Sequence, residues 1–219
     1  MSNQATQFKF TKFSVLDQLP RGWEDMISDF ALTHYQQTIL VPTATTSREE
    51  LSDLQLPVQI VGGISIRRAL PWLYDLYRGL FRDLATKCFD EEVLIAKEDQ
   101  YALNLNIQQG TEMRYECHVD SNPIAGLLYV TTHFEGEGGE LIVSNSSNAY
   151  GPIQIEKDSV RIFPRKGDLI FFDARRHPHY VSPLTSPGAR RISVAMNYYT
   201  PSCPEEMRPS DLSKHLGLE

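Results

Sequence analysis

The sequence has few cysteines and no long apolar run. Its three cysteines, Cys88, Cys117 and Cys203, lie far apart, and no two of them have the Cys-x-x-Cys spacing that a zinc knuckle or a disulfide framework would suggest. The opening stretch "MSNQATQFKF" lacks the apolar core of a secretory signal, and no later stretch approaches the length of a membrane span. We therefore expect a cytoplasmic protein from a reducing compartment, with no membrane partner.

Positive charge is also scarce. The 21 lysines and arginines stand against 28 aspartates and glutamates, which gives a net charge of −7. This balance argues against a nucleic-acid partner, because binding to a phosphate backbone favours a basic face. It still allows a local basic pocket for a small carboxylate. Hydrophobic residues make up 41% of the 219 residues, which is enough for one large domain with a real core.

The first part of the chain has helical periodicity. The stretch "GWEDMISDFALTHYQ" repeats apolar residues at helical spacing, and "PWLYDLYRGLFRDLATKC" begins with Pro71, which suits a first helical turn. The leucines and aromatic residues of the second stretch form one stripe, which predicts a surface that packs on a sheet. We see no linker that would split the chain. Residues 1–99 are therefore interpreted as a helical N-terminal buttress within a single compact unit.

From about residue 100 the apolar pattern changes to a period of two, which is typical of strands. Turns rich in Gly, Pro, Asn and Asp separate short strand candidates: "YALNLNIQ", "RYECH", "GLLYVTTH", "GELIVS", "VRIFP", "DLIFFD", "HYVSPL" and "RRISVAMNYY". Short strands preceded by helices predict an α+β, mainly β fold: a jelly roll, or double-stranded β-helix, with the N-terminal helices packed on one sheet. Residues 100–202 would form this core, and residues 203–219 a C-terminal tail.

The stretch "MRYECHVDSN" places His118 and Asp120 one residue apart, just after a strand candidate. The pair alone is weak evidence, since a turn aspartate beside a half-buried histidine often arises by chance. Two downstream segments strengthen it: "GDLIFFDARRHPHYVSPL" supplies His177 and His179, and "SPGARRISVAMNYY" supplies two adjacent arginines. An early His-x-Asp, a late histidine and a following arginine form a demanding, ordered pattern.

This pattern resembles the Fe(II)/2-oxoglutarate-dependent dioxygenases, and most closely their prolyl-4-hydroxylase-like branch. The resemblance spans roughly residues 100–200 and rests on ordered stretches: Tyr115 three residues before the first histidine, "YVT" from Tyr129, "GGEL" at 138–141, "GDLIFF" at 167–172 and "HYVSP" at 179–183. It implies that His118, Asp120 and His179 are catalytic and bind the metal. His179 is preferred to His177 because "HYVSP" has the register expected of the second histidine ligand.

The same resemblance implies Fe(II), 2-oxoglutarate and O2 as cofactor and cosubstrates, with ascorbate as an optional reductant. Neutral imidazoles and one carboxylate hold Fe(II) on a single face and leave adjacent positions open, which 2-oxoglutarate and O2 can fill. Zinc competes for such ligands. A closed structural zinc site, however, usually has four ligands rich in cysteine, and the sequence offers no evident fourth ligand.

Strand parity separates the two arginines of "ARRISVAMNYY". One side of this strand is apolar, and the other faces the barrel interior and carries Arg191, Ser193, Ala195 and Asn197. Arg191 is therefore predicted to bind the far carboxylate of 2-oxoglutarate, with Ser193 as its hydrogen-bonding companion. Arg190 is the alternative, since the spacing from the late histidine is slightly long for the family. The resemblance adds Tyr129 and Gln108 as cofactor-binding residues, although a core role is the alternative for Tyr129.

Three residues are predicted to contact the substrate because their parity directs them inward: Asn106, Arg114 and Asn197. Asn104, Asn106 and Gln108 share a strand face that either borders the cavity or is a plain exposed edge, because buried amides must find hydrogen-bond partners. Arg114 and Glu116 have the parity of His118 and so face the substrate, or they form a surface ion pair.

The sequence thus predicts a dioxygenase that oxidises a C–H bond of a small polar metabolite, such as a free amino acid, and releases succinate and CO2. Hydroxylation is the expected outcome, with desaturation and ring closure left open. One alternative is a protein hydroxylase of prolyl type. The alternative from a different class is a non-catalytic jelly-roll protein that binds a metal or a carboxylate. No motif reports the substrate or the oligomeric state.

Overall fold

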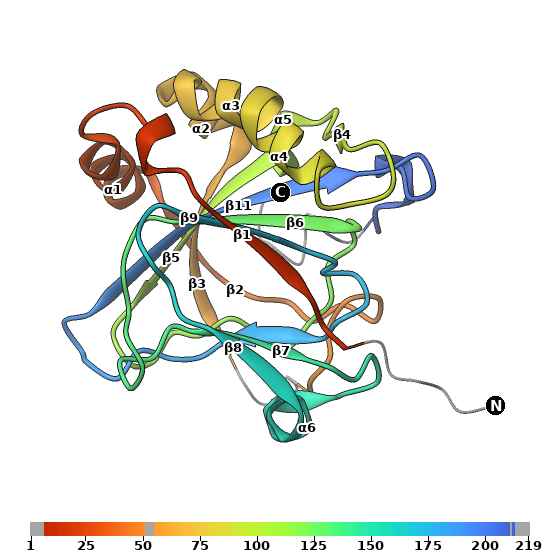
Figure 1. Cartoon of the computed structure of the whole chain (residues 1–219). Helices are drawn as coiled ribbons and strands as arrows, with labels where there is room; N and C mark the ends of the chain where they lie inside the picture. Colours follow the sequence, from red (N-terminus) through yellow and green to blue (C-terminus); the bar gives the residue numbers. More distant parts are fainter. Residues whose placement is uncertain (1–6, 51–54, 211, 213–219) are drawn as a thin grey trace.

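The computed structural model describes residues 7–50, 55–210 and 212, and its strands form two antiparallel sheets that face each other (Figure 1). The large sheet has eight strands in the order β1-β9-β6-β11-β5-β3-β2, with β4 paired to β11, and the small sheet has the order β10-β7-β8. The strands are β1 (Phe10–Ser14), β2 (Gln36–Ile39), β3 (Pro57–Gly62), β4 (Leu94–Ile95), β5 (Leu103–Gln109), β6 (Ile124–Tyr129), β7 (Leu141–Ser144), β8 (Ser159–Ile162), β9 (Asp168–Phe172), β10 (His179–Val181) and β11 (Arg190–Tyr199). This arrangement confirms the predicted jelly roll.

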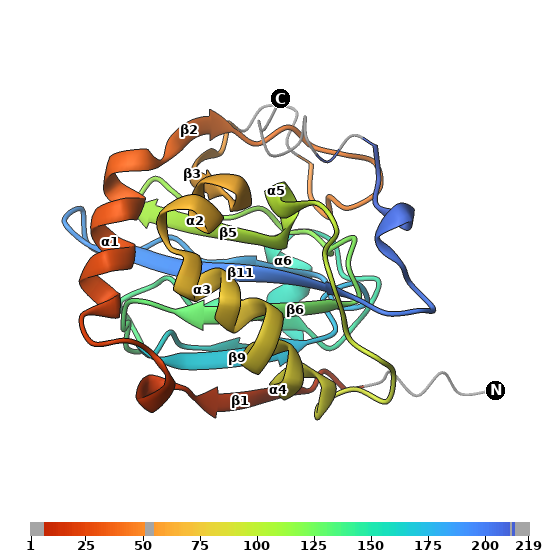
Figure 2. The same cartoon turned by 90° about the horizontal axis from the view of Figure 1, so that it is seen from above.

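Helices cover the outer face of the large sheet (Figure 2). They are α1 (Trp23–His34), α2 (Gly63–Ala69), α3 (Pro71–Leu76), the π-helical turn η2 (Tyr77–Phe81), α4 (Arg82–Thr86) and α5 (Asp99–Ala102). The predicted stripe points at the sheet, since Leu73, Tyr77 and Phe81 are fully buried. Each such side chain contributes roughly 1.5–3 kcal/mol through its burial. Elsewhere lie the short helices η1 (Leu16–Gln18), α6 (Gly151–Lys157) and η3 (Glu205–Met207). No helix within the described ranges is both long and apolar enough to cross a membrane.

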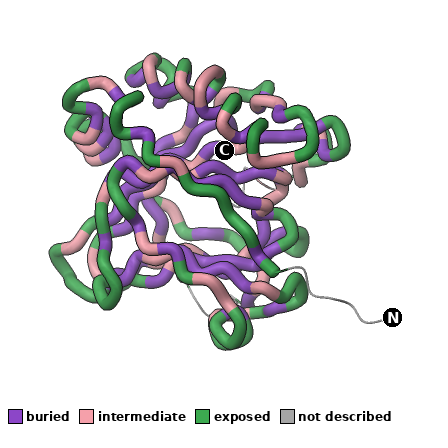
Figure 3. The backbone as a smooth tube through the Cα atoms, viewed as in Figure 1, coloured by how far each residue is buried: buried purple, intermediate pink, exposed green. Residues whose placement is uncertain are grey.

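The alternation along β11 divides the large sheet into two faces. Ile192, Val194, Met196 and Tyr198 lie in the main core together with side chains of the helices. Arg191, Ser193, Ala195 and Asn197 line a cavity on the opposite face, between the two sheets. In Figure 3, much of the backbone of the large sheet is coloured purple for buried residues. The parity predicted for this strand is therefore correct.

Two sequence predictions need correction. The stretch "RYECH" forms no regular strand; within it, His118 makes isolated bridges to Ser47 and His179. Residues 1–99 are also more than helical, because β1 pairs with β9 and β3 pairs with β5 inside the large sheet. The division into a buttress and a core stays a prediction. Of the predicted tail, residues 211 and 213–219 lie outside the described residues.

Candidate active site

The two histidines of the predicted site face each other across neighbouring chain segments. Reciprocal backbone hydrogen bonds of 2.9 Å join His118 and His179, and their ring centroids are 4.3 Å apart. Asp120 Oδ1 lies 3.2 Å from His118 Nε2 and 3.7 Å from His179 Nε2. One ligand atom from each residue fits within a 4.8 Å spread. These three residues lie up to 61 positions apart in the sequence, and their side chains converge on a space that suits a single cation.

Each ring is oriented by a carbonyl two residues earlier in the chain. His118 Nδ1 lies 2.8 Å from the carbonyl oxygen of Glu116, and His179 Nδ1 lies 2.8 Å from that of His177. Because a carbonyl only accepts, both Nδ1 atoms carry the proton and both Nε2 atoms are left as ligands. This repeated arrangement matches how metal-binding histidines are held.

Burial and charge set the protonation of the two rings. Burial, with a further effect from the nearby His118, lowers the pKa of His179 to about 4. Burial also opposes a charge on His118, but the hydrogen bond and the charge of Asp120 outweigh it and raise the pKa of His118. A neutral imidazole is the form that binds a metal, and His179 holds that form readily.

The other downstream histidine points elsewhere. His177 Nδ1 lies 3.0 Å from the carbonyl oxygen of Ser144, and its ring packs edge-on against Phe8 at 5.2 Å. The structure therefore brings His179, and not His177, to His118 and Asp120. Aromatic rings flank the pair: Tyr115 lies 5.2 Å from the ring of His118, and Phe172 lies 5.5 Å from that of His179.

Arg191 lies in the same cavity and is only 3% exposed, whereas its neighbour Arg190 is exposed. Its Nη1 donates to Ser193 Oγ at 3.1 Å, and its Nε has no hydrogen-bond partner. Among the described residues no carboxylate pairs with it, and burial lowers the pKa of its guanidinium. A buried cation without a counter-ion is costly. The residues present therefore fit an anionic ligand such as the carboxylate of 2-oxoglutarate.

Tyr129 and Gln108 lie on either side of this arginine. The Tyr129 ring is 5.5 Å from the Arg191 guanidinium; burial raises the Tyr129 pKa to about 12, against the lowering effect of that cation. The hydroxyl of Tyr129 is buried and has no partner within hydrogen-bonding geometry. Gln108 pairs with Arg191 across the strands, but its Nε2 already donates to the carbonyl oxygens of Met113 and Ser182 at 2.7 and 2.6 Å. Of the two side chains, Tyr129 is the one whose donor makes no hydrogen bond here.

The stretch "GGEL" has a steric role next to this pocket. Gly139 has φ +76°, and a Cβ there would lie 3.1 Å from Arg191 Cδ and 3.0 Å from Leu184. At Gly138, also with φ +76°, a Cβ would lie 2.1 Å from the carbonyl oxygen of Pro183. Both positions combine a left-handed backbone with close contact, which only glycine tolerates. Gly139 thus lets the chain pass close to Arg191, and Gly138 lets it pass close to the backbone of Pro183.

The remaining predicted residues line the cavity, but some are already paired. Asn106 lies on its wall, and β5 runs between β11 and β3, so the amide face borders the cavity and is not an exposed edge. Asn197 Nδ2 donates to the carbonyl oxygen of Tyr101 at 2.6 Å. Arg114 forks onto Glu49, with N–O distances of 2.8 and 3.0 Å. The surface ion pair between Arg114 and Glu116 that the sequence left open is therefore wrong, because Arg114 binds Glu49 and Glu116 is fully buried.

Sequence reasoning missed the residues that come from the loop between β2 and β3. Thr46 lines the cavity, Ser47 bridges to His118, and Glu49 binds Arg114. Tyr101, at the end of α5, is a further wall residue. The sequence held no signal for the loop residues, because their partners lie far along the chain and no periodic pattern links them.

A family model described as the 2OG-Fe(II) oxygenase superfamily matches residues 103–199. This part of the chain is therefore similar to that superfamily. Its members are oxidoreductases that depend on Fe(II) and 2-oxoglutarate, which agrees with the convergence of His118, Asp120 and His179 and with the unpaired buried Arg191. No curated protein matches the sequence.

Solved structures of 2OG-Fe(II) oxygenases share the fold. The non-heme alpha-ketoglutarate-dependent carbocyclase SnoK from nogalamycin biosynthesis superposes with a TM-score of 0.62 at 12% identity, covering 100% of this chain and 91% of that one. A prolyl hydroxylase from Trichoplax adhaerens, in complex with a hypoxia inducible factor peptide fragment, gives 0.60 at 16% identity over 91% and 85%. The epimerase SnoN, in complex with Fe3+, alpha ketoglutarate and nogalamycin RO, gives 0.60 at 14% over 92% and 85%. Solved structures of this fold thus include one complex with a peptide and one with a small molecule.

Proposed function

We propose that this protein is an Fe(II)- and 2-oxoglutarate-dependent oxygenase that oxidises a C–H bond of a small polar metabolite, with hydroxylation as the expected outcome. The observation that carries the proposal is the presence in one cavity of the His118, Asp120 and His179 ligand atoms and of a buried arginine that has no counter-ion among the described residues. The first group suits Fe(II), and Arg191 suits a dicarboxylate cosubstrate. A free amino acid is the first substrate class to test.

The residues of the chain have separate tasks. His118 and His179 offer Nε2 atoms, and Asp120 supplies the only carboxylate, so that Fe(II) would be held on one face. Iron held by these residues would, with 2-oxoglutarate and O2, supply the oxidising chemistry, and 2-oxoglutarate would be converted to succinate and CO2. Arg191 binds the far carboxylate of the cosubstrate and Ser193 holds its guanidinium in place.

Other residues in and around the cavity have proposed roles that follow from their positions. The hydroxyl of Tyr129, buried beside Arg191, is placed to donate to the same carboxylate. The rings of Tyr115 and Phe172 flank the histidines and keep bulk water from that part of the cavity. Asn106, Asn197 and Arg114 line the cavity and are proposed to contact the substrate. Of these residues, Arg114 acts from within its ion pair with Glu49.

Succinate release tests the proposal. The purified protein is incubated with Fe(II), 2-oxoglutarate and ascorbate, alone and with a panel of amino acids, small acids and a proline-containing peptide. We expect one substrate class to stimulate turnover, and His118→Ala and Arg191→Ala to abolish it, while the exposed control Arg190→Ala retains it. Iron binding without any turnover of 2-oxoglutarate would identify a binding protein instead. Stimulation by the peptide alone would identify a protein hydroxylase.

A further inference from the structure

The segment that carries His118 is held between two other parts of the chain. On one side it pairs with His179. On the other side, residues 46–48 run alongside it: Val119 N donates to the carbonyl oxygen of Thr46 at 2.9 Å, and Arg48 N donates to that of Cys117 at 2.6 Å. This second neighbour belongs to the loop between β2 and β3, outside the part of the chain that the family model matches.

Side chains of the same loop add to these backbone contacts. Glu49 is 6% exposed and accepts three hydrogen bonds, from Nη1 and Nη2 of Arg114 and, at 3.0 Å, from the backbone N–H of Cys117. Ser47 Oγ donates to the carboxylate of Glu116 at 3.1 and 3.2 Å. The loop therefore forms hydrogen bonds with both residues that immediately precede His118, namely Glu116 and Cys117.

These contacts bear on the ring of His118 because its Nδ1 donates to the carbonyl oxygen of Glu116. The backbone at residues 116–118 thus determines both where the ring starts and how it is turned. A shift of this backbone moves Nε2 away from Asp120 and His179. Outer groups that orient a metal ligand in this way commonly change metal affinity about 10- to 100-fold when they are removed.

We propose that Glu49 and Ser47 are positioning residues for the metal centre, which hold His118 in place through the backbone at residues 116–117. The inference rests on the proposed function, since it takes His118 to be a metal ligand. It assigns the ion pair of Arg114 and Glu49 a role in iron binding, beyond the substrate contact proposed for Arg114. A merely structural ion pair would contribute to stability and leave iron affinity unchanged.

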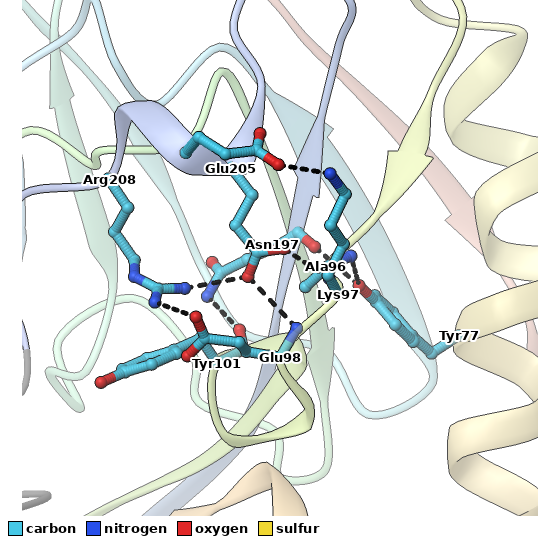
Figure 4. Close-up of polar contacts among 9 residues, drawn as sticks. Tyr77, Ala96, Lys97, Glu98, Tyr101, Asn197, Glu205 and Arg208 are labelled. Carbon is cyan, nitrogen blue, oxygen red and sulfur yellow. Dashed lines mark hydrogen bonds and ion pairs between the residues drawn. The ribbon is translucent and has the colours of Figure 1, made fainter.

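The chain offers a matched control at Glu205, shown in Figure 4. This carboxylate is also buried, at 7% exposed, and also binds an arginine and backbone N–H groups: Arg208 Nη1 at 2.9 Å, Glu98 N at 3.4 Å and Lys97 N. None of these partners is a candidate metal ligand or a chain neighbour of one. Glu205→Gln therefore imposes a similar structural loss away from the metal centre.

The experiment measures Fe(II) affinity under anaerobic conditions without 2-oxoglutarate, together with the melting temperature. We expect Glu49→Gln to weaken Fe(II) binding about tenfold. Glu205→Gln should lower the melting temperature and leave Fe(II) binding unchanged. The double variant Glu49→Leu/Arg114→Met removes the unpaired charge and so recovers stability. Its Fe(II) affinity should stay low, because leucine offers no acceptor to the Cys117 N–H.

Several results would overturn the inference. Wild-type Fe(II) affinity in Glu49→Gln would do so, as would an equal loss in Glu205→Gln or full recovery of affinity in the double variant. If the Glu49 variants do not fold, Ser47→Ala removes one hydroxyl only; it is expected to weaken Fe(II) binding, and wild-type affinity there would reject the role of the loop. Absence of Fe(II) binding by the wild-type protein would instead refute the proposed function.

Discussion

Replacement of Arg191 by methionine should have opposite effects on the free protein and on cosubstrate binding. The guanidinium is 3% exposed, donates one hydrogen bond to Ser193, and has no carboxylate partner within the described residues. Replacing such a buried charge with an apolar side chain of similar volume should raise the free energy of unfolding of the ligand-free protein by about 1–3 kcal/mol. Loss of the fork to a carboxylate should cost about 3 kcal/mol of binding, or about 100-fold in the Kd of 2-oxoglutarate.

Urea unfolding with and without 2-oxoglutarate, in the presence of Fe(II) and without O2, measures both effects in one assay. The wild-type protein should be stabilised by 2-oxoglutarate, and Arg191→Met should start from a higher midpoint and gain little. Arg190→Met is the matched control, because its exposed side chain lies on the neighbouring position. A destabilised Arg191→Met protein with wild-type affinity for 2-oxoglutarate would refute the reasoning. A loss of 2-oxoglutarate affinity in Arg190→Met and not in Arg191→Met would also refute it.

Three further predictions concern single side chains. Asp120→Asn should weaken Fe(II) binding more than about 100-fold in an anaerobic titration, since it removes a charged ligand and not an outer group; unchanged affinity would contradict the site. Tyr129→Phe should weaken 2-oxoglutarate binding about fivefold, the value of one hydrogen bond. It should not lower the melting temperature of the free protein, because the Tyr129 hydroxyl makes no hydrogen bond there. The hydrogen bond from Tyr74, against an opposing effect of burial, and the cation of Arg67 lower the pKa of Asp99. Its contribution to stability is therefore full above the ordinary carboxyl pKa of about 4 and is lost as pH falls through the lowered value. Asp99→Asn should flatten this acid limb of a plot of melting temperature against pH, and an unchanged limb would show that other carboxylates dominate.

Sequence periodicity predicted the strands that have one apolar and one polar face. β11 is the clearest case: its apolar residues enter the main core, and its other residues line the cavity. The alternation works there because both faces are buried against different surroundings. The helical stripe beginning at Pro71 was predictable for the same reason, since one face packs on the sheet and the other meets water.

Periodicity failed for the strands that lie at the edges of the large sheet. β1, with the sequence FTKFS, and β2, with the sequence QQTI, are mainly exposed and follow no apolar alternation. Their pairing is specified by partners far along the chain, β9 for the first and β3 for the second. The stretch "RYECH" failed in the opposite sense, because its alternation is real but its neighbours are two short segments and not full strands. A single sequence shows the apolar alternation of a segment but does not show which segment pairs with it.

The candidate metal ligands could be predicted, whereas the residues that hold them could not. His118, Asp120 and His179 carry a short motif with fixed spacing and an ordered set of flanking stretches. Glu49 has no motif, and its contacts with Arg114 and Cys117 span 65 and 68 residues. The boundary drawn at residue 99 therefore separates two periodicities, but contacts cross it at β1, at β3 and at the loop beside His118. A fragment limited to residues 100–202 would keep every motif, but it would lose the pairing of β5 with β3, the pairing of β9 with β1 and one side of the His118 segment. The candidate metal ligands thus lie in the core, whereas part of what holds the His118 segment lies before it in the chain.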